Sequence, residues 1–375
     1  MSQYTSDETG IPLSTFQRID VTKTFLPPLE DYLVYLTQIW ETNQLTNNGP
    51  LVNELEAKLK AYLSVNHLFF VSNGTIALQI AIKALNLRNE IITTPFSYVA
   101  TISSIVWEGC LPVFVDIDPQ TLCIDPNLIE TAITEKTTGI LATHVYGIPC
   151  AVEQIEAIAQ RYHLKVIYDA AHRLCGGYNG KSIVSYGDIS TLSFHATKVF
   201  HTVEGGALIT NDDELAGRIR YMRNFGHKGQ EAFWGLGING KNSEFHAAMG
   251  LCNLPYVSEI ISRREKISGW YDELKHEMGI KRPTVPTGTD YNFAYYPAQL
   301  SSEKKLLRIQ ERLNDRQIYP RRYFYPPLSD LPYVTKNPCP ITQSISPRIL
   351  CLPLYPELER DQIHRISEII GSDHP

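Results

Sequence analysis

Two residues with complementary chemistry follow two apolar segments of the chain. Lys198 lies shortly after the apolar segment 189–194, and Asp169 directly follows the apolar segment 166–168. An amine and a carboxylate at the ends of two buried strands are what pyridoxal phosphate chemistry requires, because the amine condenses with the cofactor aldehyde and the carboxylate keeps the pyridine nitrogen protonated. The pair predicts pyridoxal 5'-phosphate as cofactor, with Lys198 and Asp169 as catalytic residues. The structural alternatives are a solvated loop lysine and a helix-capping aspartate.

A phosphate site is predicted in the segment 72–78, which follows a predicted strand and opens a predicted helix. Gly74 allows close approach of the backbone, Thr75 adds a hydroxyl donor, and the free N–H groups of the first helical turn face an anion. Ser193, five residues before Lys198, supplies a second hydroxyl. A strand-to-helix turn with a polar cap explains the same segment without a ligand.

Three more side chains are candidates for cofactor contact, and each also has a structural explanation. Tyr98, near the start of a predicted helix, could stack on the cofactor ring or belong to the core. His172 could contact the ring or its 3-hydroxyl, or be a packed, hydrogen-bonded histidine. Asn239 precedes a predicted helix, and its immediate sequence is typical of a turn followed by a cap.

Alternation of short apolar segments with helical patterns favours an α/β fold, with a mainly parallel seven-stranded sheet covered by helices on both faces. The predicted strands are 68–72, 90–94, 112–116, 139–144, 165–169, 189–194 and 206–210. The predicted helices between them include 73–86, 97–109, 151–163 and 212–225, after a leucine stripe over 51–63. Ligands of such sheets bind beyond the carboxyl ends of the strands, where Asp169 and Lys198 fall.

The alternation of short apolar segments with helical patterns ends near residue 254. We expect a large domain over 20–254 and a smaller C-terminal α+β domain over 255–375, with residues 1–19 extended or packed nearby. The smaller domain is predicted to contain a long charged helix over 257–278 and a terminal helix over 357–370. Between them lies a segment rich in Pro, Tyr and Arg.

Composition excludes several functional classes. The 375 residues are 43% hydrophobic and 20% charged, which is ordinary for a globular protein, and no apolar stretch approaches the roughly 18 residues of a membrane span. The seven cysteines are dispersed without a CxxC pair, which favours a reduced cytoplasmic protein without a metal site. The net charge of −6 and the absence of a basic run argue against nucleic-acid binding, and the polar segment 1–11 does not resemble a secretion signal.

These motifs, in this order, resemble those of the DegT/DnrJ/EryC1 family of pyridoxal-phosphate-dependent nucleotide-sugar aminotransferases, which have the aspartate-aminotransferase-like fold type I. The matching segments are 73–78, 95–101, 169–172, 193–198, 204–206 and 237–239. The resemblance implies that Thr75, the Ile76 amide and Ser193 bind the cofactor phosphate.

For the other candidates, the resemblance implies that Tyr98 stacks on the ring, Asp169 pairs with its nitrogen and His172 lies near it. It makes Lys198 the residue that joins the aldehyde. It also implies a homodimer with shared active sites, in which Asn239 reaches the phosphate in the neighbouring subunit. Arg173, which is small or aromatic in many relatives, has no explanation from the sequence.

Within the family, the chain most resembles members that transfer an amino group from L-glutamate to C4 of dTDP-4-keto-6-deoxy-D-glucose for O-antigen synthesis. The expected products are dTDP-4-amino-4,6-dideoxy-D-glucose and 2-oxoglutarate. Candidates for binding the dTDP-sugar are His195, Lys241, Arg321 and Tyr323, since arginine and lysine pair well with diphosphate. A solvated charged surface is the alternative for Arg321 and Lys241.

Two other functions stay open. Amination at C3 of a dTDP-3-keto-6-deoxyhexose uses nearly the same motifs. A non-catalytic regulator that binds the cofactor is the second alternative, although it would not require an intact Lys198. Related sugar dehydratases have histidine in place of this lysine, which argues against dehydration.

Overall fold

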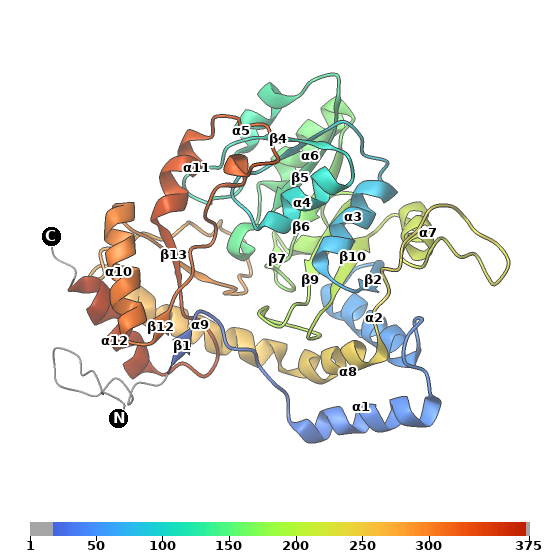
Figure 1. The fold of residues 1–375 in the computed structure, drawn as a ribbon, viewed down its shortest axis with the longest axis horizontal. Helices are drawn as coiled ribbons and strands as arrows, with labels where there is room; N and C mark the ends of the chain where they lie inside the picture. Colours follow the sequence, from blue (N-terminus) through green and yellow to red (C-terminus); the bar gives the residue numbers. More distant parts are fainter. Residues whose placement is uncertain (1–17, 373–375) are drawn as a thin grey trace.

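A seven-stranded sheet forms the centre of the fold (Figure 1). The computed structural model describes residues 18–372. The strand order is β2–β10–β9–β6–β5–β3–β4, and only β10 runs antiparallel to its neighbours. The strands are β2 (His67–Val71), β3 (Glu90–Thr93), β4 (Leu111–Phe114), β5 (Thr137–Thr143), β6 (Lys165–Asp169), β9 (Ile189–Ser193) and β10 (Gly206–Thr210). The predicted mainly parallel seven-stranded sheet is confirmed, with each strand end within two residues of its predicted position.

Successive side chains of a strand point to opposite sides of the sheet, and both sides are covered by helices, so both faces are buried. On β2, Leu68 and Phe70 belong to one apolar cluster, whereas Phe69 and Val71 belong to the other. The first cluster includes α2 (Pro50–Leu63), α6 (Val152–Tyr162) and α8 (Glu244–Asn253). The second includes α3 (Gly74–Ala84), α4 (Val99–Trp107) and α7 (Asp213–Met222).

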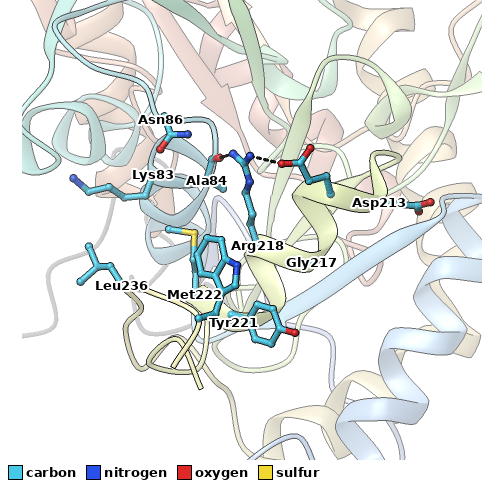
Figure 2. Close-up of a pocket in the computed structure, with 11 residues that line it drawn as sticks. Lys83, Ala84, Asn86, Asp213, Gly217, Arg218, Tyr221, Met222 and Leu236 are labelled. Carbon is cyan, nitrogen blue, oxygen red and sulfur yellow. Dashed lines mark hydrogen bonds and ion pairs between the residues drawn. The ribbon is translucent and has the colours of Figure 1, made fainter. Parts of the chain in front are cut away.

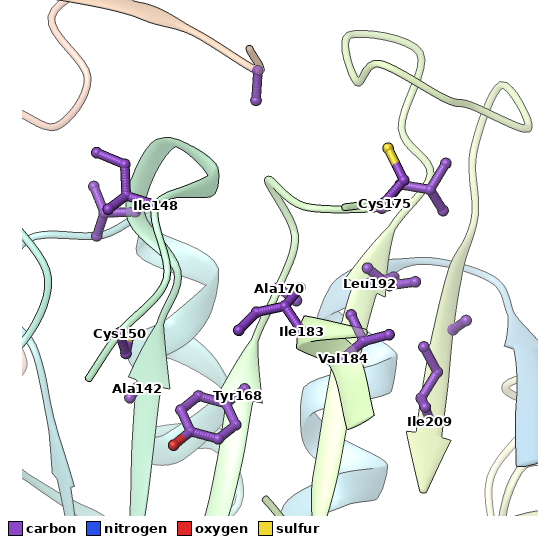
Figure 3. Close-up of a cluster of buried hydrophobic side chains, with 14 of the residues drawn as sticks. Ala142, Ile148, Cys150, Tyr168, Ala170, Cys175, Ile183, Val184, Leu192 and Ile209 are labelled. Atoms are coloured by element: carbon purple, nitrogen blue, oxygen red, sulfur yellow. The ribbon is translucent and has the colours of Figure 1, made fainter. Parts of the chain in front are cut away.

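Figure 3 shows part of the first cluster, where side chains from neighbouring strands lie on the same side of the sheet. Tyr168 on β6, Leu192 on β9 and Ile209 on β10 are each at most 1% exposed. This burial fixes the register of the three strands, since a shift by one residue would move each side chain to the other face. The strand ends that carry the candidate site are therefore held by the core.

The C-terminal part has a separate apolar core, which includes Tyr271, Ile309 and Ile366. Its elements are α9 (Val257–Leu274), β11 (Tyr296–Gln299), α10 (Glu303–Asp315), β12 (Ile318–Tyr319), α11 (Pro340–Ile345), β13 (Ile349–Leu352) and α12 (Arg360–Gly371). The predicted helices 257–278 and 357–370 correspond to α9 and α12. The proposed boundary at 254/255 falls in the turn Leu254–Tyr256, which joins α8 to α9.

The first described residues join this C-terminal part. Strand β1 (Ile19–Asp20) pairs in parallel with β12, and Ile19 is buried in the same core. Residues 1–17 of the predicted N-terminal segment lie outside the described residues.

Helix α1 (Leu29–Thr42) lies along the lower edge of the view in Figure 1, beside α8. Its Ile39 is buried against the body of the protein, whereas Leu29, Leu33 and Trp40 are 65%, 49% and 68% exposed. Over residues 18–372, the structure contains no helix with the length and apolar character of a membrane span.

The remaining short α-helix is α5 (Pro126–Ile129), and the remaining short strands are β7 (Gly177–Tyr178) and β8 (Lys181–Ser182).

Candidate active site

The predicted catalytic residues meet at one edge of the sheet. Strands β6 and β9 are parallel neighbours, so Asp169 at the end of β6 and the loop that carries Lys198 after β9 lie at the same edge. Strand β2 runs in the same direction, because β10 is antiparallel to both β2 and β9. The turn from β2 into α3 therefore reaches this edge too.

A cavity of about 280 Å³ lies at this edge. The predicted site residues that line it are Gly74, Thr75, Tyr98, Asp169, His172, Ser193, His195, Lys198 and Tyr323. The sequence motifs, which are up to about 250 residues apart, are thus brought to one place by the parallel strand order.

Lys198 is positioned by the turn that follows β9. Its backbone N–H donates to the carbonyl of His195 at 2.9 Å, and the N–H of Thr202 closes the loop onto the carbonyl of Phe194 at 2.9 Å. Burial lowers the pKa of the Lys198 amine to about 8, although the Asp169 carboxylate acts in the opposite direction. About a tenth of the amine is thus uncharged at pH 7, far more than for an ordinary lysine, and this neutral form can act as nucleophile or base.

Asp169 is 5% exposed and accepts hydrogen bonds on both oxygens. The Thr101 hydroxyl donates to Oδ2 at 2.8 Å, and the N–H of Ala171 donates to Oδ1 at 3.1 Å. Burial raises the pKa of the Asp169 carboxyl, whereas these two donors and the Lys198 amine oppose the increase. The surroundings are therefore built to keep a buried carboxylate charged, as a partner of a cationic ring nitrogen must be.

His172 is packed in an aromatic cluster at the side of the cavity. Its ring stacks on Phe324, with ring centres 5.5 Å apart, and meets Tyr295 edge-on at 5.1 Å. Burial holds the pKa of His172 well below its usual value, so the ring is neutral. Its Nδ1 is buried and has no hydrogen-bond partner among residues 18–372. A buried polar atom of this kind normally has a partner, which a ligand in the cavity can provide.

The predicted phosphate site lies at the N-terminus of α3. Asn73 caps the helix by accepting a hydrogen bond from the Ile76 N–H at 2.8 Å, so the proposed phosphate contact of that amide would share its donor. Ile76 does not line the cavity, whereas Gly74, Thr75 and Ser193 do. A Cβ on Gly74 would lie 3.1 Å from the Ser193 Cβ, so glycine keeps this corner of the cavity open.

Three of the predicted residues lie at the mouth of the cavity. Tyr98 is 57% exposed, which leaves its ring available for stacking. Nδ1 of His195 accepts from the Thr197 N–H, and its Nε2 faces the Glu204 carboxylate at 3.6 Å. Tyr323 packs edge-on against Tyr295, with ring centres 5.7 Å apart.

Besides Ile76, three predicted residues do not line this cavity. Asn239 is exposed, and its side-chain oxygen accepts a hydrogen bond from the Lys241 amine at 2.7 Å. Lys241 also lies 4.6 Å from the ring centre of Phe225. Arg321 is exposed, and its backbone pairs with Cys351. Their proposed contacts with a partner subunit or a nucleotide remain predictions.

The structure adds lining residues that the sequence analysis did not assign to the site. Tyr295 and Phe324 reach the cavity from the C-terminal part, and Glu204 lies at its mouth. No local pattern marks the first two, because their position depends on how the C-terminal part packs on the sheet. Thr101 belongs to the site through its hydrogen bond to Asp169 and does not line the cavity. Its role could have been suspected from the sequence, since it lies one helical turn after Tyr98.

Arg173 has a structural explanation. Its side chain is fully buried and donates to the carbonyls of Gly147, Gly177 and Asp290, the last at 2.7 Å. It does not line the cavity. Arg173 therefore joins three segments of the chain and does not contact the cavity.

A second hollow, of about 630 Å³, opens on the surface at the other end of α3 (Figure 2). Lys83 and Ala84 of α3 line it together with Arg218 and Met222 of α7 and Leu236. Arg218 donates to the carbonyl of Ala84 at 3.3 Å and pairs with Glu214, so its charge is already used. This hollow has no lining residue in common with the Lys198 cavity.

The donors and acceptors of the cavity fit pyridoxal phosphate. His172 Nδ1 is unpartnered within the described chain, Asp169 is a buried carboxylate, and the glycine-lined turn before α3 offers space and donors for an anion. Lys198 provides an amine with a lowered pKa beside them. Such a set can bind an aldehyde cofactor and move protons at carbon.

Comparison with known proteins supports this assignment. The family model described as the DegT/DnrJ/EryC1/StrS aminotransferase family matches residues 29–371. A protein of Shigella dysenteriae named dTDP-4-amino-4,6-dideoxy-D-glucose transaminase is 43% identical over 360 residues, which span 94% of this chain and 98% of that protein. A protein of Escherichia coli with the same name is 39% identical, with the same coverage of both chains.

The fold is similar to that of a solved relative. The crystal structure of DesI in the presence of its TDP-sugar product has a TM-score of 0.91 and 31% sequence identity to this chain. The match covers 97% of this chain and 94% of the DesI chain. The similarity therefore includes the sheet, the C-terminal part and their relative arrangement.

Proposed function

Since the chain belongs to the DegT/DnrJ/EryC1/StrS aminotransferase family and is a pyridoxal-phosphate-dependent nucleotide-sugar aminotransferase, we propose that its substrates are L-glutamate and dTDP-4-keto-6-deoxy-D-glucose. The products would be 2-oxoglutarate and dTDP-4-amino-4,6-dideoxy-D-glucose. The observation that carries the choice of sugar is the full-length similarity to two transaminases with that name. The geometry of the cavity supports the reaction class.

The proposed roles follow from the positions of the side chains. When bound, pyridoxal phosphate supplies an aldehyde carbon that accepts the amino group and a cationic ring that withdraws electrons from the reacting carbon. Asp169 would accept a hydrogen bond from the ring nitrogen, and Thr75 and Ser193 would hold the phosphate. The Lys198 amine would take the proton from the carbon of glutamate that bears nitrogen and later deliver a proton to the sugar carbon.

The site must also accept two very different substrates in turn. Its mouth is lined by His195, Glu204 and Tyr323, which offer both donors and acceptors around the opening. We propose that the sugar nucleotide enters at this mouth, with Arg321 and Lys241 as candidates for the diphosphate. Both have an exposed or partly exposed side chain, which leaves them accessible to a ligand.

We further propose a homodimer with shared active sites. Asn239 does not line the cavity of its own chain and is exposed, as a residue that serves a neighbouring site would be. The apolar side chains of Leu29, Leu33 and Trp40 on α1 are also exposed, and apolar surface of this kind is typical of interfaces.

The cysteines of the chain are free and buried, in keeping with a proposed cytoplasmic, reducing location.

The decisive experiment supplies the purified enzyme with pyridoxal phosphate, L-glutamate and a panel of keto sugars. We expect mass spectrometry to detect an amino sugar from dTDP-4-keto-6-deoxyglucose, and NMR to place the nitrogen at C4. Conversion of only the 3-keto isomer would establish C3 amination instead. Absence of transfer with every keto sugar, while the cofactor is bound, would favour a regulator. Lys198→Ala protein serves as the control for uncatalysed exchange.

A further inference from the structure

Three buried hydroxyl groups form a hydrogen-bonded series that ends at Asp169. The Thr101 hydroxyl is 2.8 Å from Asp169 Oδ2, and the Ser97 hydroxyl is 2.8 Å from that of Thr101. The Thr143 hydroxyl lies 3.1 Å from that of Ser97. Ser97, Thr101 and Thr143 are each at most 2% exposed, so water does not compete for these bonds.

The direction of the hydrogen bonds in this chain is fixed by proton counting. A carboxylate only accepts, so Thr101 must donate its single hydroxyl proton to Asp169. Thr101 is then the acceptor for Ser97, and Ser97, whose proton is used, is the acceptor for Thr143. All three O–H dipoles therefore point toward Asp169. Hydrogen bonds aligned in this way polarise one another and strengthen the last bond of the chain.

The fold places these hydroxyls on β5, on α4 and on the segment that precedes α4, all beside Asp169. Thr143 is the last residue of β5 and lies opposite Asp169 in the register of the neighbouring strand. Ser97 precedes α4, and Thr101 lies in its first turn. None of the three is the N-cap of α4, which is Tyr98, so helix capping does not explain Ser97.

A nearby threonine shows that paired hydroxyls are not required for burial in this sheet. Thr93, at the end of β3, is fully buried, and its hydroxyl has no hydrogen-bond partner among residues 18–372. The alignment at Ser97, Thr101 and Thr143 is thus specific to the surroundings of Asp169.

We propose that Thr101, Ser97 and Thr143 are positioning residues that keep Asp169 ionised and oriented toward the pyridine nitrogen of the cofactor. This inference rests on the cofactor but not on the identity of the sugar. The three hydroxyls oppose the effect of burial on Asp169. Burial by itself favours the neutral carboxylic acid and would leave the ring nitrogen without its proton. The hydroxyl chain would thereby set how strongly the ring withdraws electrons.

The test uses the holoenzyme reconstituted with pyridoxal phosphate that carries ¹⁵N in the ring. NMR of this nitrogen against pH reports the pH at which it loses its proton, and cofactor dissociation is measured separately by equilibrium dialysis. The variants are Thr101→Val, Ser97→Ala and Thr143→Val. Thr93→Val is the matched control, because it removes a buried threonine hydroxyl that does not belong to the hydrogen-bonded series ending at Asp169.

We expect effects that decrease with distance from Asp169. Thr101→Val should lower the pH of nitrogen deprotonation and weaken cofactor binding at least about tenfold, since it removes a bond to a charged group. Ser97→Ala should weaken binding about threefold through loss of polarisation, and Thr143→Val by less than that. Thr93→Val should match the wild-type protein, and Thr101→Ser, which keeps the hydroxyl, should stay within about twofold of it.

Several outcomes would overturn the proposal. The first is an unchanged nitrogen titration in Thr101→Val, and the second is an equal change in Thr101→Val and Thr93→Val, which would indicate general loosening of the core. If Thr101→Val does not fold, a Ser97→Ala titration identical to that of the wild-type protein would have the same meaning. A wild-type protein that fails to bind pyridoxal phosphate would overturn the cofactor assignment as well, so the two failures are distinguishable.

Discussion

The surroundings of Lys198 and Asp169 prepare both side chains for cofactor chemistry, through burial at the lysine and through hydrogen-bond donors at the aspartate. The pKa of the lysine amine is lowered to about 8, whereas the rise that burial causes in the pKa of the aspartate carboxyl is opposed by two hydrogen-bond donors. The lysine thus has an accessible neutral form, and the two donors act to keep the aspartate charged. Neither property can be read from residue type, because both depend on what surrounds the side chain.

The lowered pKa of Lys198 predicts how cofactor uptake depends on pH. Only the neutral amine attacks an aldehyde, so the rate of capture by cofactor-free protein should rise roughly tenfold per pH unit and level off above about pH 8. An ordinary lysine would continue to gain rate up to about pH 10. Stopped-flow absorbance after mixing with pyridoxal phosphate measures the profile.

The same experiment on Lys198→Ala gives the background from surface lysines. This variant should also lose amino transfer by a factor of about 10³ or more, because it removes both the nucleophile and the proton carrier. Full activity of Lys198→Ala would contradict the assigned role of this residue.

Arg173 leads to a prediction about stability. Arg173→Met would leave the carbonyls of Gly147, Gly177 and Asp290 without their donor, at a cost of about 3 kcal/mol in the free energy of unfolding. The KM for the sugar nucleotide should remain that of the wild-type enzyme, since Arg173 does not line the cavity. Urea unfolding and steady-state kinetics measure the two quantities. A raised KM in folded Arg173→Lys protein would point to a substrate contact instead.

At the scale of elements, the site depends on where strands end. Strand β10 begins at the same edge at which β2 and β9 end, so Gly206 lies beside the turn into α3. A Cβ at Gly206 would be 2.5 Å from the carbonyl carbon of Asn73 and 2.7 Å from the Gly74 nitrogen. Glycine at this position therefore lets β10 approach the phosphate turn closely.

This close approach predicts the effect of one added methyl group. Gly206→Ala should displace the turn before α3 and weaken binding of pyridoxal phosphate by roughly tenfold or more, because aligned backbone donors at a helix N-terminus are sensitive to position. Isothermal titration with the cofactor measures the loss.

Gly217→Ala, in the middle of α7, is the matched control. Nothing lies within 4 Å of a Cβ there, so affinity should be unchanged and stability should increase by up to about 1 kcal/mol. Equal affinity of the Gly206→Ala and wild-type proteins for pyridoxal phosphate would contradict the proposed phosphate site at the turn before α3.

The sequence predicted those parts of the fold in which a local pattern has one physical cause. Strands β6 and β10 were predicted with their observed bounds, because residues buried on both faces leave a continuous apolar segment. Pairs such as β1 with β12 have two residues each and give no such pattern. The approach of Tyr295 and Phe324 to the cavity depends on long-range packing, which periodicity does not encode.

At the scale of the whole molecule, Asn239 and several apolar side chains of α1 are exposed on the single chain. If Asn239 serves the neighbouring site, two inactive variants with defects in different residues should restore each other. Mixing Lys198→Ala with Asn239→Asp under subunit exchange should recover about a quarter of wild-type activity, since half of the dimers are mixed and each has one intact site.

Each variant alone should remain inactive or nearly so, and analytical ultracentrifugation should show dimers for both. Recovery of no activity from a mixture that demonstrably exchanges subunits would mean that each chain completes its own site.

The pairing of β1 with β12 has a consequence for how the protein is made. Ile19 precedes every strand of the central sheet, whereas its partner Ile318 and the helix α12 are synthesised after all of them. The central sheet, complete by Thr210, can assemble while translation continues, whereas β1 must wait until β12 has been made. A stalled nascent chain that stops before residue 318 should therefore show a protease-resistant sheet, while β1 is still digested.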